Sequence, residues 1–197
     1  MCLLIETIRI EDGKLQNISF HNERLNRSRR ELLGIENEFD LEKIINIPYS
    51  VHNGKYKCRV IYSAEIISVT FSKYEIKKLL TLQIVEDDTI NYAYKYLDRK
   101  QIEKLKFNMK ASDILIIKKG FITDISYANI VFSDGKKWIT PSSPLLLGTM
   151  RSKLLKENKI QEEELRKSDI KLFKSAKIIN AMTELEISPE IKISNIF

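Results

Sequence analysis

The chain of 197 residues is 43% hydrophobic, so it can bury a core but leaves room for only one large domain or two small ones. Its 33 basic and 27 acidic residues are mixed along the chain, and the densest basic run, residues 24–30, has no interleaved aromatic residues, which argues against nucleic-acid binding. No apolar run approaches the roughly 18 residues of a membrane span, so we expect no membrane association.

Targeting and metal-binding patterns are also missing from the sequence. Glu6 interrupts the start of the chain where a signal peptide would need a long apolar core, so we expect a cytoplasmic protein. Cys2 and Cys58 are too few for a disulfide framework, and with His21 and His52 they show none of the spacings of a zinc site. We therefore expect neither a disulfide framework nor a metal.

The first part of the chain alternates strand-like and helix-like runs. Asp12-Gly13 is a turn signal between two strand-like runs and predicts a β-hairpin, and Gly34 is placed to end a helix. We predict strands over residues 3–10, 14–20, 56–63 and 66–74, and helices over residues 22–33 and 41–47. Together they predict a small N-terminal α/β domain over residues 1–78.

A larger C-terminal domain is predicted over residues 79–197, after a lysine-rich stretch that we take as the boundary. Its predicted helices cover residues 99–109 and 148–158. Its predicted strands cover residues 80–85, 114–118, 122–132, 137–140, 176–182 and 190–193. The polar stretch over residues 161–174 carries no predicted element.

The most informative motif lies in residues 120–151. Asp124 and Asn129 interrupt an apolar strand, and Gly148 stands at the mouth of a predicted helix. Unpaired backbone N–H groups and the helix dipole make such a helix start a potential anion site. On the physics of these residues alone, an ordinary strand–turn–helix explains the segment better.

The order of these residues nevertheless resembles a known family. Thr-acidic-x-x-x-x-Asn, then Thr-Pro, then Leu-x-Gly-x-x-Arg is similar to the signature region of the class IV aminotransferases, which are pyridoxal 5′-phosphate (PLP) enzymes of fold type IV. Further pieces match in the expected order along the chain: Glu6-Thr7, His21-x-x-Arg24-Leu25, Arg59, Lys95-x-Leu97-Asp98-Arg99 and Asn180-Ala181-Met182. The resemblance implies an α+β protein with two small α/β domains of the D-amino acid aminotransferase-like type.

The same resemblance implies a role for individual residues. Lys95 resembles the lysine that forms the Schiff base with PLP, although without that context it would be read as a surface lysine. Arg24 resembles the arginine that grips the cofactor phosphate, a role that suits its planar donor fork. Thr149 and Met150 match residues whose backbone amides hold the same phosphate. Asn180 and Ala181 match a turn that, in the family, lines the cofactor site on the side of the phosphate and the substrate.

Two further positions depart from the family or leave alternatives open. Asp124 falls where the family usually has Glu, paired with the pyridinium nitrogen that makes PLP an electron sink. Asp keeps the charge but is one methylene shorter. Arg59 resembles a strand arginine that faces the substrate carboxylate in some members, and a structural ion pair with Glu6 is the alternative.

Among the family's activities, the sequence favours a lyase. Lys95-Tyr96-Leu97-Asp98-Arg99 and Asn180-Ala181-Met182 are similar to the 4-amino-4-deoxychorismate lyases, which release pyruvate and 4-aminobenzoate for folate biosynthesis. The branched-chain aminotransferases place a tyrosine where this chain has Lys100. We therefore predict a PLP-dependent enzyme acting on a small amino-bearing carboxylate, as a homodimer like most of the family.

Other functions stay open at this point. A segment that family members usually carry ahead of the Glu6-Thr7 strand is missing, and the middle region is short, so the substrate pocket is expected to be more open or completed by a partner subunit. An amino-acid aminotransferase of branched-chain or D-amino-acid type is the alternative. A catalytically degenerate binding protein, which the Asp124 departure permits, is a further one.

Overall fold

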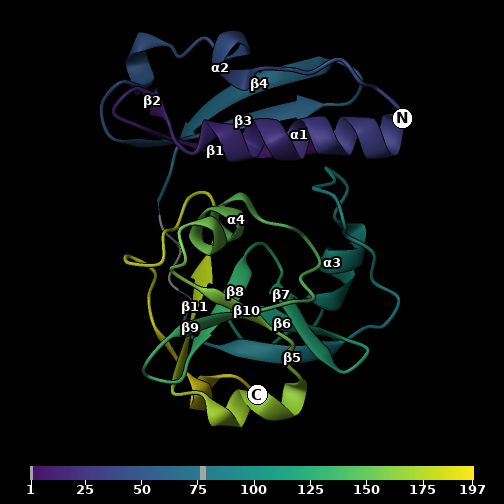
Figure 1. The fold of residues 1–197 in the computed structure, drawn as a ribbon, viewed down its shortest axis with the longest axis vertical. Helices are drawn as coiled ribbons and strands as arrows, with labels where there is room; N and C mark the ends of the chain where they lie inside the picture. The colour runs from purple at the N-terminus through teal and green to yellow at the C-terminus, as the bar shows by residue number, and fades with distance from the viewer. Residues whose placement is uncertain (1, 76–78) are drawn as a thin grey trace. The chain divides into compact units, whose positions relative to one another are not determined.

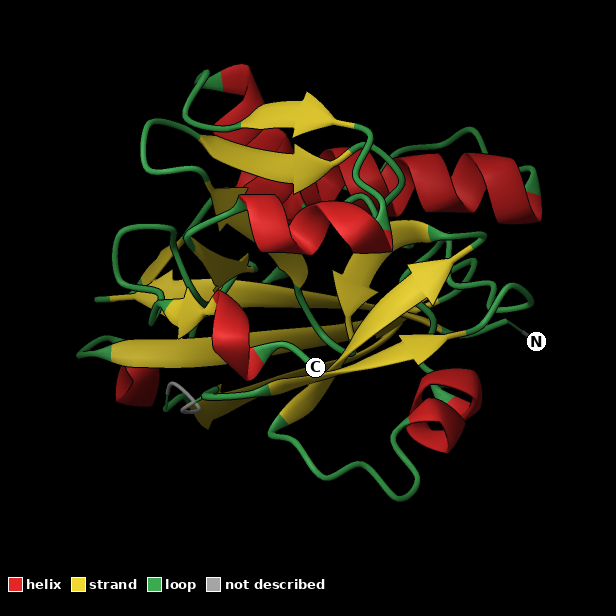
Figure 2. Ribbon diagram, turned by 90° about the horizontal axis from the view of Figure 1, so that it is seen from below, coloured by secondary structure: helices red, strands yellow, loops and turns green. Residues whose placement is uncertain are grey.

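The computed structural model describes residues 2–75 and 79–197, which form two compact units. The first unit contains residues 2–75 together with Tyr94–Asp98, and the second contains residues 79–93 and Arg99–Phe197. The boundary predicted after residue 78 lies outside the described residues. Helices and strands both contribute to the regular structure (Figure 2), so the predicted α+β class is confirmed.

The first unit is built on a four-stranded antiparallel sheet with the strand order β2-β1-β3-β4. Its strands are β1 (Leu4–Glu11), β2 (Lys14–Leu15), β3 (Lys55–Tyr62) and β4 (Ile66–Lys73). Its helices are α1 (Ile18–Leu33), α2 (Leu41–Ile44) and a 3-10 turn, η1 (Tyr49–Val51). Asp12 and Gly13 both have positive φ, as the predicted hairpin turn requires.

Helix α1 covers one face of this sheet (Figure 1). Leu25 of α1 is buried in one cluster with Leu4 and Ile8 of β1 and Cys58 of β3. The predicted strand over residues 14–20 is wrong beyond Leu15, because α1 begins at Ile18, four residues earlier than predicted. Hydrophobic residues after Leu15, such as Ile18, belong to α1 and pack against the hydrophobic core on the sheet.

The second unit contains a larger mixed sheet with the order β10-β9-β8-β7-β6-β5, to which β11 is added beside β8 and β12 beside β11. Figure 1 labels most of these strands. The strands are β5 (Leu82–Glu86), β6 (Asp113–Lys118), β7 (Phe121–Ile125), β8 (Asn129–Ser133), β9 (Trp138–Pro141), β10 (Gln161–Glu163), β11 (Ser175–Ile179) and β12 (Ile191–Lys192). The helices are α3 (Lys100–Leu105), α4 (Thr149–Lys156) and the 3-10 turns η2 (Lys167–Leu172) and η3 (Ile193–Asn195).

Two sequence predictions for this unit are wrong. The single strand predicted over residues 122–132 is two strands, β7 and β8, which turn back on each other so that Asp124 pairs with Asn129. The polar stretch over residues 161–174 contains β10 and η2; β10 is fully exposed, so it lacks the apolar residues that would reveal a strand. Among the described residues, no helix combines the length and the apolar character needed to cross a membrane.

Candidate functional site

Glu6 is the centre of a buried polar network in the first unit. Its carboxylate accepts hydrogen bonds from Arg24 Nε at 2.8 Å and Arg24 Nη2 at 2.5 Å, and lies 2.6 Å from His21 Nδ1. Glu6 comes from β1, whereas His21 and Arg24 lie three residues apart on α1 and so share one helix face. The sequence prediction found Arg24 but missed these two partners; the His21-x-x-Arg24 spacing was the available signal.

The charges in this network are strongly coupled. Burial alone would raise the pKa of Glu6, but the Arg24 charge and the hydrogen bonds with His21 and Arg24 outweigh it and lower the pKa to about 2. Burial lowers the pKa of His21 against the raising effect of Glu6, so His21 is neutral near pH 7. A neutral His21 that donates from Nδ1 to Glu6 keeps Nε2 as an acceptor, and Nε2 is buried without a hydrogen-bond partner among the described residues.

Lys95 belongs to the same unit through a short segment that pairs with β1. The Lys95 carbonyl accepts a hydrogen bond from Ile5 N at 2.9 Å, and Leu97 N donates to Leu3 O at 2.8 Å. Tyr96 packs against the core of this unit, while Lys95 itself is half-buried. The Lys95 charge is close enough to contribute to the lowered pKa of His21. Two predicted site residues, Arg24 and Lys95, are therefore gathered around His21.

Arg59 lies on the opposite face of the sheet from Glu6. Thr7 pairs with Arg59 and Glu6 pairs with Val60 between β1 and β3, and successive side chains of a strand alternate between faces. The alternative of an Arg59–Glu6 ion pair is therefore wrong, since Glu6 is bound by Arg24 and His21. The role of Arg59 toward a substrate carboxylate stays a prediction.

In the second unit, Asp124 stands in a β-bulge. Thr123 and Asp124 of β7 lie opposite a single residue of β6, Ile116, whose carbonyl accepts a hydrogen bond from the Thr123 hydroxyl at 2.7 Å. On either side of the bulge, Ile122 and Ile125 both join the hydrophobic core of this unit although they are three positions apart. We infer that the extra residue directs both Thr123 and Asp124 away from that core.

The Asp124 carboxylate is held by two donors. Asn129 Nδ2 donates to Oδ1 at 2.7 Å, and the backbone N of Leu146 donates to Oδ2 at 3.0 Å. Asn129 also donates to the Leu146 carbonyl at 2.9 Å, so strand β8 and the loop before α4 are tied to the same carboxylate. Burial raises the pKa of Asp124 to about 6, against the lowering effects of Leu146, Asn129 and Arg151.

Helix α4 begins directly after this loop. Gly148 is its N-cap, and no side chain of the described residues caps the helix there. Thr149 and Met150 are buried at the first turn, as the predicted role of their amides requires. Arg151 is fixed by a hydrogen bond to the Pro141 carbonyl and an ion pair with Glu162.

Asn180 and Ala181 form a tight turn in the same unit. Asn180 and Thr183 exchange backbone hydrogen bonds at 3.0 and 3.1 Å, and Asn180 Oδ1 accepts a bond from Met182 N at 2.8 Å. The Asn180 side chain therefore shapes its own turn. Contact of this turn with a ligand stays a prediction.

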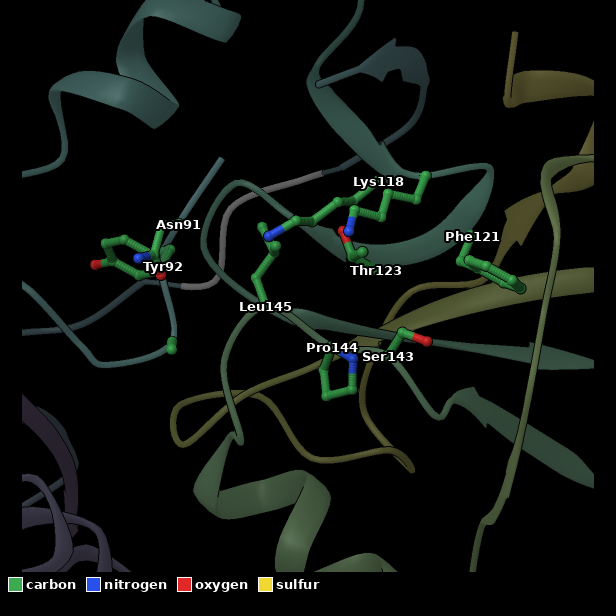
Figure 3. Close-up of a pocket in the computed structure, with 10 residues that line it drawn as sticks. Asn91, Tyr92, Lys118, Phe121, Thr123, Ser143, Pro144 and Leu145 are labelled. Atoms are coloured by element: carbon green, nitrogen blue, oxygen red, sulfur yellow. The ribbon is translucent and has the colours of Figure 1, made fainter. Parts of the chain in front are cut away.

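A pocket of about 350 Å³ lies within the second unit, next to the bulge. Figure 3 shows Asn91 and Tyr92 on one side of it, Lys118 and Thr123 on another, and the Leu145 loop below. The sequence analysis did not find this pocket, because its residues come from three separate segments of the chain.

Comparison with known proteins identifies the family. The sequence model of amino-transferase class IV matches residues 3–188. An uncharacterized protein of Haemophilus influenzae is 45% identical over 185 residues, which are 92% of this chain and 98% of the relative. A crystal structure from Haemophilus somnus 129PT, of a protein provisionally named a 4-amino-4-deoxychorismate lyase, is 34% identical, covers 94% of this chain and 98% of its own, and has a TM-score of 0.88.

A more distant structure shares the fold. A hypothetical aminotransferase of Mycobacterium tuberculosis in its PLP-bound form is 15% identical, with a TM-score of 0.77 over 96% of this chain and 80% of its own. The family match extends over nearly the whole chain, and the TM-scores of 0.88 and 0.77 show that the related structures share the fold. The protein therefore belongs to the amino-transferase class IV family.

Proposed function

We propose that this protein is a PLP-dependent enzyme in which Lys95 carries the cofactor, and that it acts as a 4-amino-4-deoxychorismate lyase, releasing pyruvate and 4-aminobenzoate. The observation that carries the choice of reaction is the likeness, at 34% identity over 94% of the chain, to the Haemophilus somnus protein that bears this provisional name. The choice of cofactor is supported by the family and by the chemistry of the residues described above.

Asp124 fits the partner of a protonated ring nitrogen. It is a fully buried carboxylate, and among the described residues it has two neutral hydrogen-bond donors but no ion-paired cation. A buried carboxylate without a cation is costly, and its raised pKa expresses that cost. The positive charge of a pyridinium would offset this cost.

Each unit offers one candidate group for binding the phosphate: Arg24 in the first unit and the start of α4 in the second. No side chain of the described residues caps the first turn of α4, which offers the backbone N–H groups of Thr149 and Met150 together with the positive end of the helix dipole. Glu6 fixes the orientation of the Arg24 guanidinium through two hydrogen bonds. Glu6 also neutralises much of the Arg24 charge.

The remaining chemistry belongs to Lys95. When bound, PLP supplies an aldehyde and a ring that accepts the electron pair left at the substrate Cα. Lys95 would hold the cofactor through its neutral amine, and the same amine would serve as the base that removes and returns the substrate Cα proton. Asp124 would supply the negative charge that keeps the ring nitrogen protonated.

Absorbance and product analysis test the proposal. We expect the purified protein to bind PLP with a yellow colour, and borohydride reduction followed by peptide mapping to find the label on Lys95. Incubation with aminodeoxychorismate should then yield pyruvate and 4-aminobenzoate. Amino-group transfer from an amino acid to 2-oxoglutarate, without release of 4-aminobenzoate, would show an aminotransferase instead. Protein that stays colourless with PLP would contradict the proposal and support a non-catalytic binding protein.

A further inference from the structure

The pocket of the second unit has a cationic wall. Lys118 and Lys119 both line it, and no Asp or Glu is among its lining residues. Within the described chain, neither lysine ammonium is paired with a carboxylate; Lys118 Nζ donates to the Ile90 carbonyl at 2.6 Å, and the carboxylate of Asp88 binds only the backbone N of Lys119. Two positive charges at a concave site that has no carboxylate among its lining residues favour an anionic ligand.

The rest of the lining suits a small organic ligand. Tyr92 and Phe121 provide aromatic surface on two sides, while Thr123 and Ser143 bring hydroxyl groups. A volume of about 350 Å³ is near the lower end of the range for small-molecule sites. The pocket therefore has room for one ring with its substituents and little more.

The pocket adjoins the residues that hold Asp124. Thr123 precedes Asp124 in the β-bulge, and Leu145 precedes Leu146, whose backbone N binds the Asp124 carboxylate. A ligand in the pocket would touch the same bulge and the same loop that fix Asp124. Ala93, another lining residue, is two positions before Lys95 in the chain.

We propose that this pocket binds the carboxylate-bearing ring of the substrate, with Lys118 and Lys119 as the residues that recognise its negative charge. This assignment rests on the proposed lyase function. It adds that the substrate is a ring-bearing carboxylate rather than a short aliphatic amino acid. Lys118 has a second role, because its bond to the Ile90 carbonyl also holds the segment that carries Tyr92.

Calorimetric titration of the PLP-treated protein with 4-aminobenzoate tests this proposal, with 4-aminobenzamide as the uncharged analogue. We expect 4-aminobenzoate to bind better than the amide, with an affinity that falls as salt is added. Lys119→Gln and Lys118→Gln should each weaken the binding by about tenfold, as expected for loss of one charge contact. Lys118→Arg should retain most of it, because the charge is kept.

Lys136→Gln is the matched control, since it removes one exposed lysine of the same unit away from the pocket. Equal binding of the acid and the amide would overturn the proposal, as would equal affinities of Lys119→Gln, Lys118→Gln and Lys136→Gln. The two proposals fail separately: if PLP is not taken up but 4-aminobenzoate binds in a Lys119-dependent way, the proposed reaction is wrong and the anion pocket stands. If PLP labels Lys95 but neither lysine affects binding, only the pocket proposal is wrong.

Discussion

Gly148 lies so close to Asn129 that a Cβ at position 148 would be 1.9 Å from the Asn129 Oδ1 atom. Gly148 has φ of −73°, which any residue can adopt, so the need for glycine here is steric. The close approach joins the loop before α4 to the strand residue that donates to Asp124. The candidate ring-nitrogen partner and the candidate phosphate-binding helix start thus share one rigid contact.

Gly148→Ala should therefore damage cofactor binding. The added methyl group must displace Asn129 or the loop, and either movement disturbs the bonds to Asp124. We expect PLP affinity to fall by about tenfold or more, or about 1.4 kcal/mol, measured by absorbance titration. Leu147→Ala, which trims a partly exposed side chain of the same loop, is the control. Unchanged PLP affinity in Gly148→Ala would contradict this reading.

Asp124 should give the folded protein a characteristic pH dependence. Its pKa is about 6 in the folded chain against an ordinary value of 3.8, so the folded state binds more protons than the unfolded state between these values. Its contribution to the free energy of unfolding is full below about pH 3.8 and is lost as the pH rises to about 6, an effect of up to about 3 kcal/mol. Asp124→Asn should remove this decline, measured by urea unfolding without PLP at several pH values.

Glu6 should show the opposite dependence. Its pKa is lowered from 4.5 to about 2, so its contribution to stability is full above pH 4.5 and is lost as the pH falls toward 2. Glu6→Gln should cost about 3–5 kcal/mol near pH 7, because it leaves Arg24 buried without its ionic partner. Glu38→Gln, at an exposed pair with Arg30, should change little. The two variants would have equal unfolding midpoints if the Glu6 network were unimportant.

Lys95→Ala separates chemistry from folding. The Lys95 side chain is half-buried, and backbone hydrogen bonds join its segment to β1, so we expect a folded protein. Turnover should fall by about a thousandfold or more, since loss of a covalent catalytic group removes the main route of the reaction. The borohydride label should disappear with it. Lys104→Ala, on the exposed side of α3, should keep both the label and the turnover.

Local signals in the sequence were enough for some elements. The Asp12-Gly13 hairpin and the end of α1 at Gly34 depend on backbone conformations that favour particular residues, and both were predicted. The reversal between β7 and β8 was missed because Ser126-Tyr127-Ala128 contains neither Gly nor Pro. The pairing of Asp124 with Asn129 closes that turn.

In the candidate site, too, the sequence revealed the residues that belong to local motifs but not the distant residues that contact them. Arg24, Lys95 and Asp124 could be selected by their order along the chain, because the family motifs are local. The partners of these residues could not, since Glu6 reaches Arg24 across 18 positions and Leu146 reaches Asp124 across 22. Such contacts form only when strands and helices pack together, so no local motif reveals them. The pocket lined by Lys118 is formed by three separate segments and could not be predicted for the same reason.

The segment Tyr94–Asp98 has one more consequence. It belongs to the first unit while the chain before and after it belongs to the second, so the polypeptide passes from one unit to the other three times. Cutting the chain once near residue 78 would separate Leu4 of β1 from Tyr96, with which it forms a β-bridge. Lys95 would then lie on the C-terminal fragment, apart from the rest of the first unit. A fragment ending near residue 78 would therefore lack one segment of the first unit, and the complementary fragment would carry that segment without the rest of its unit.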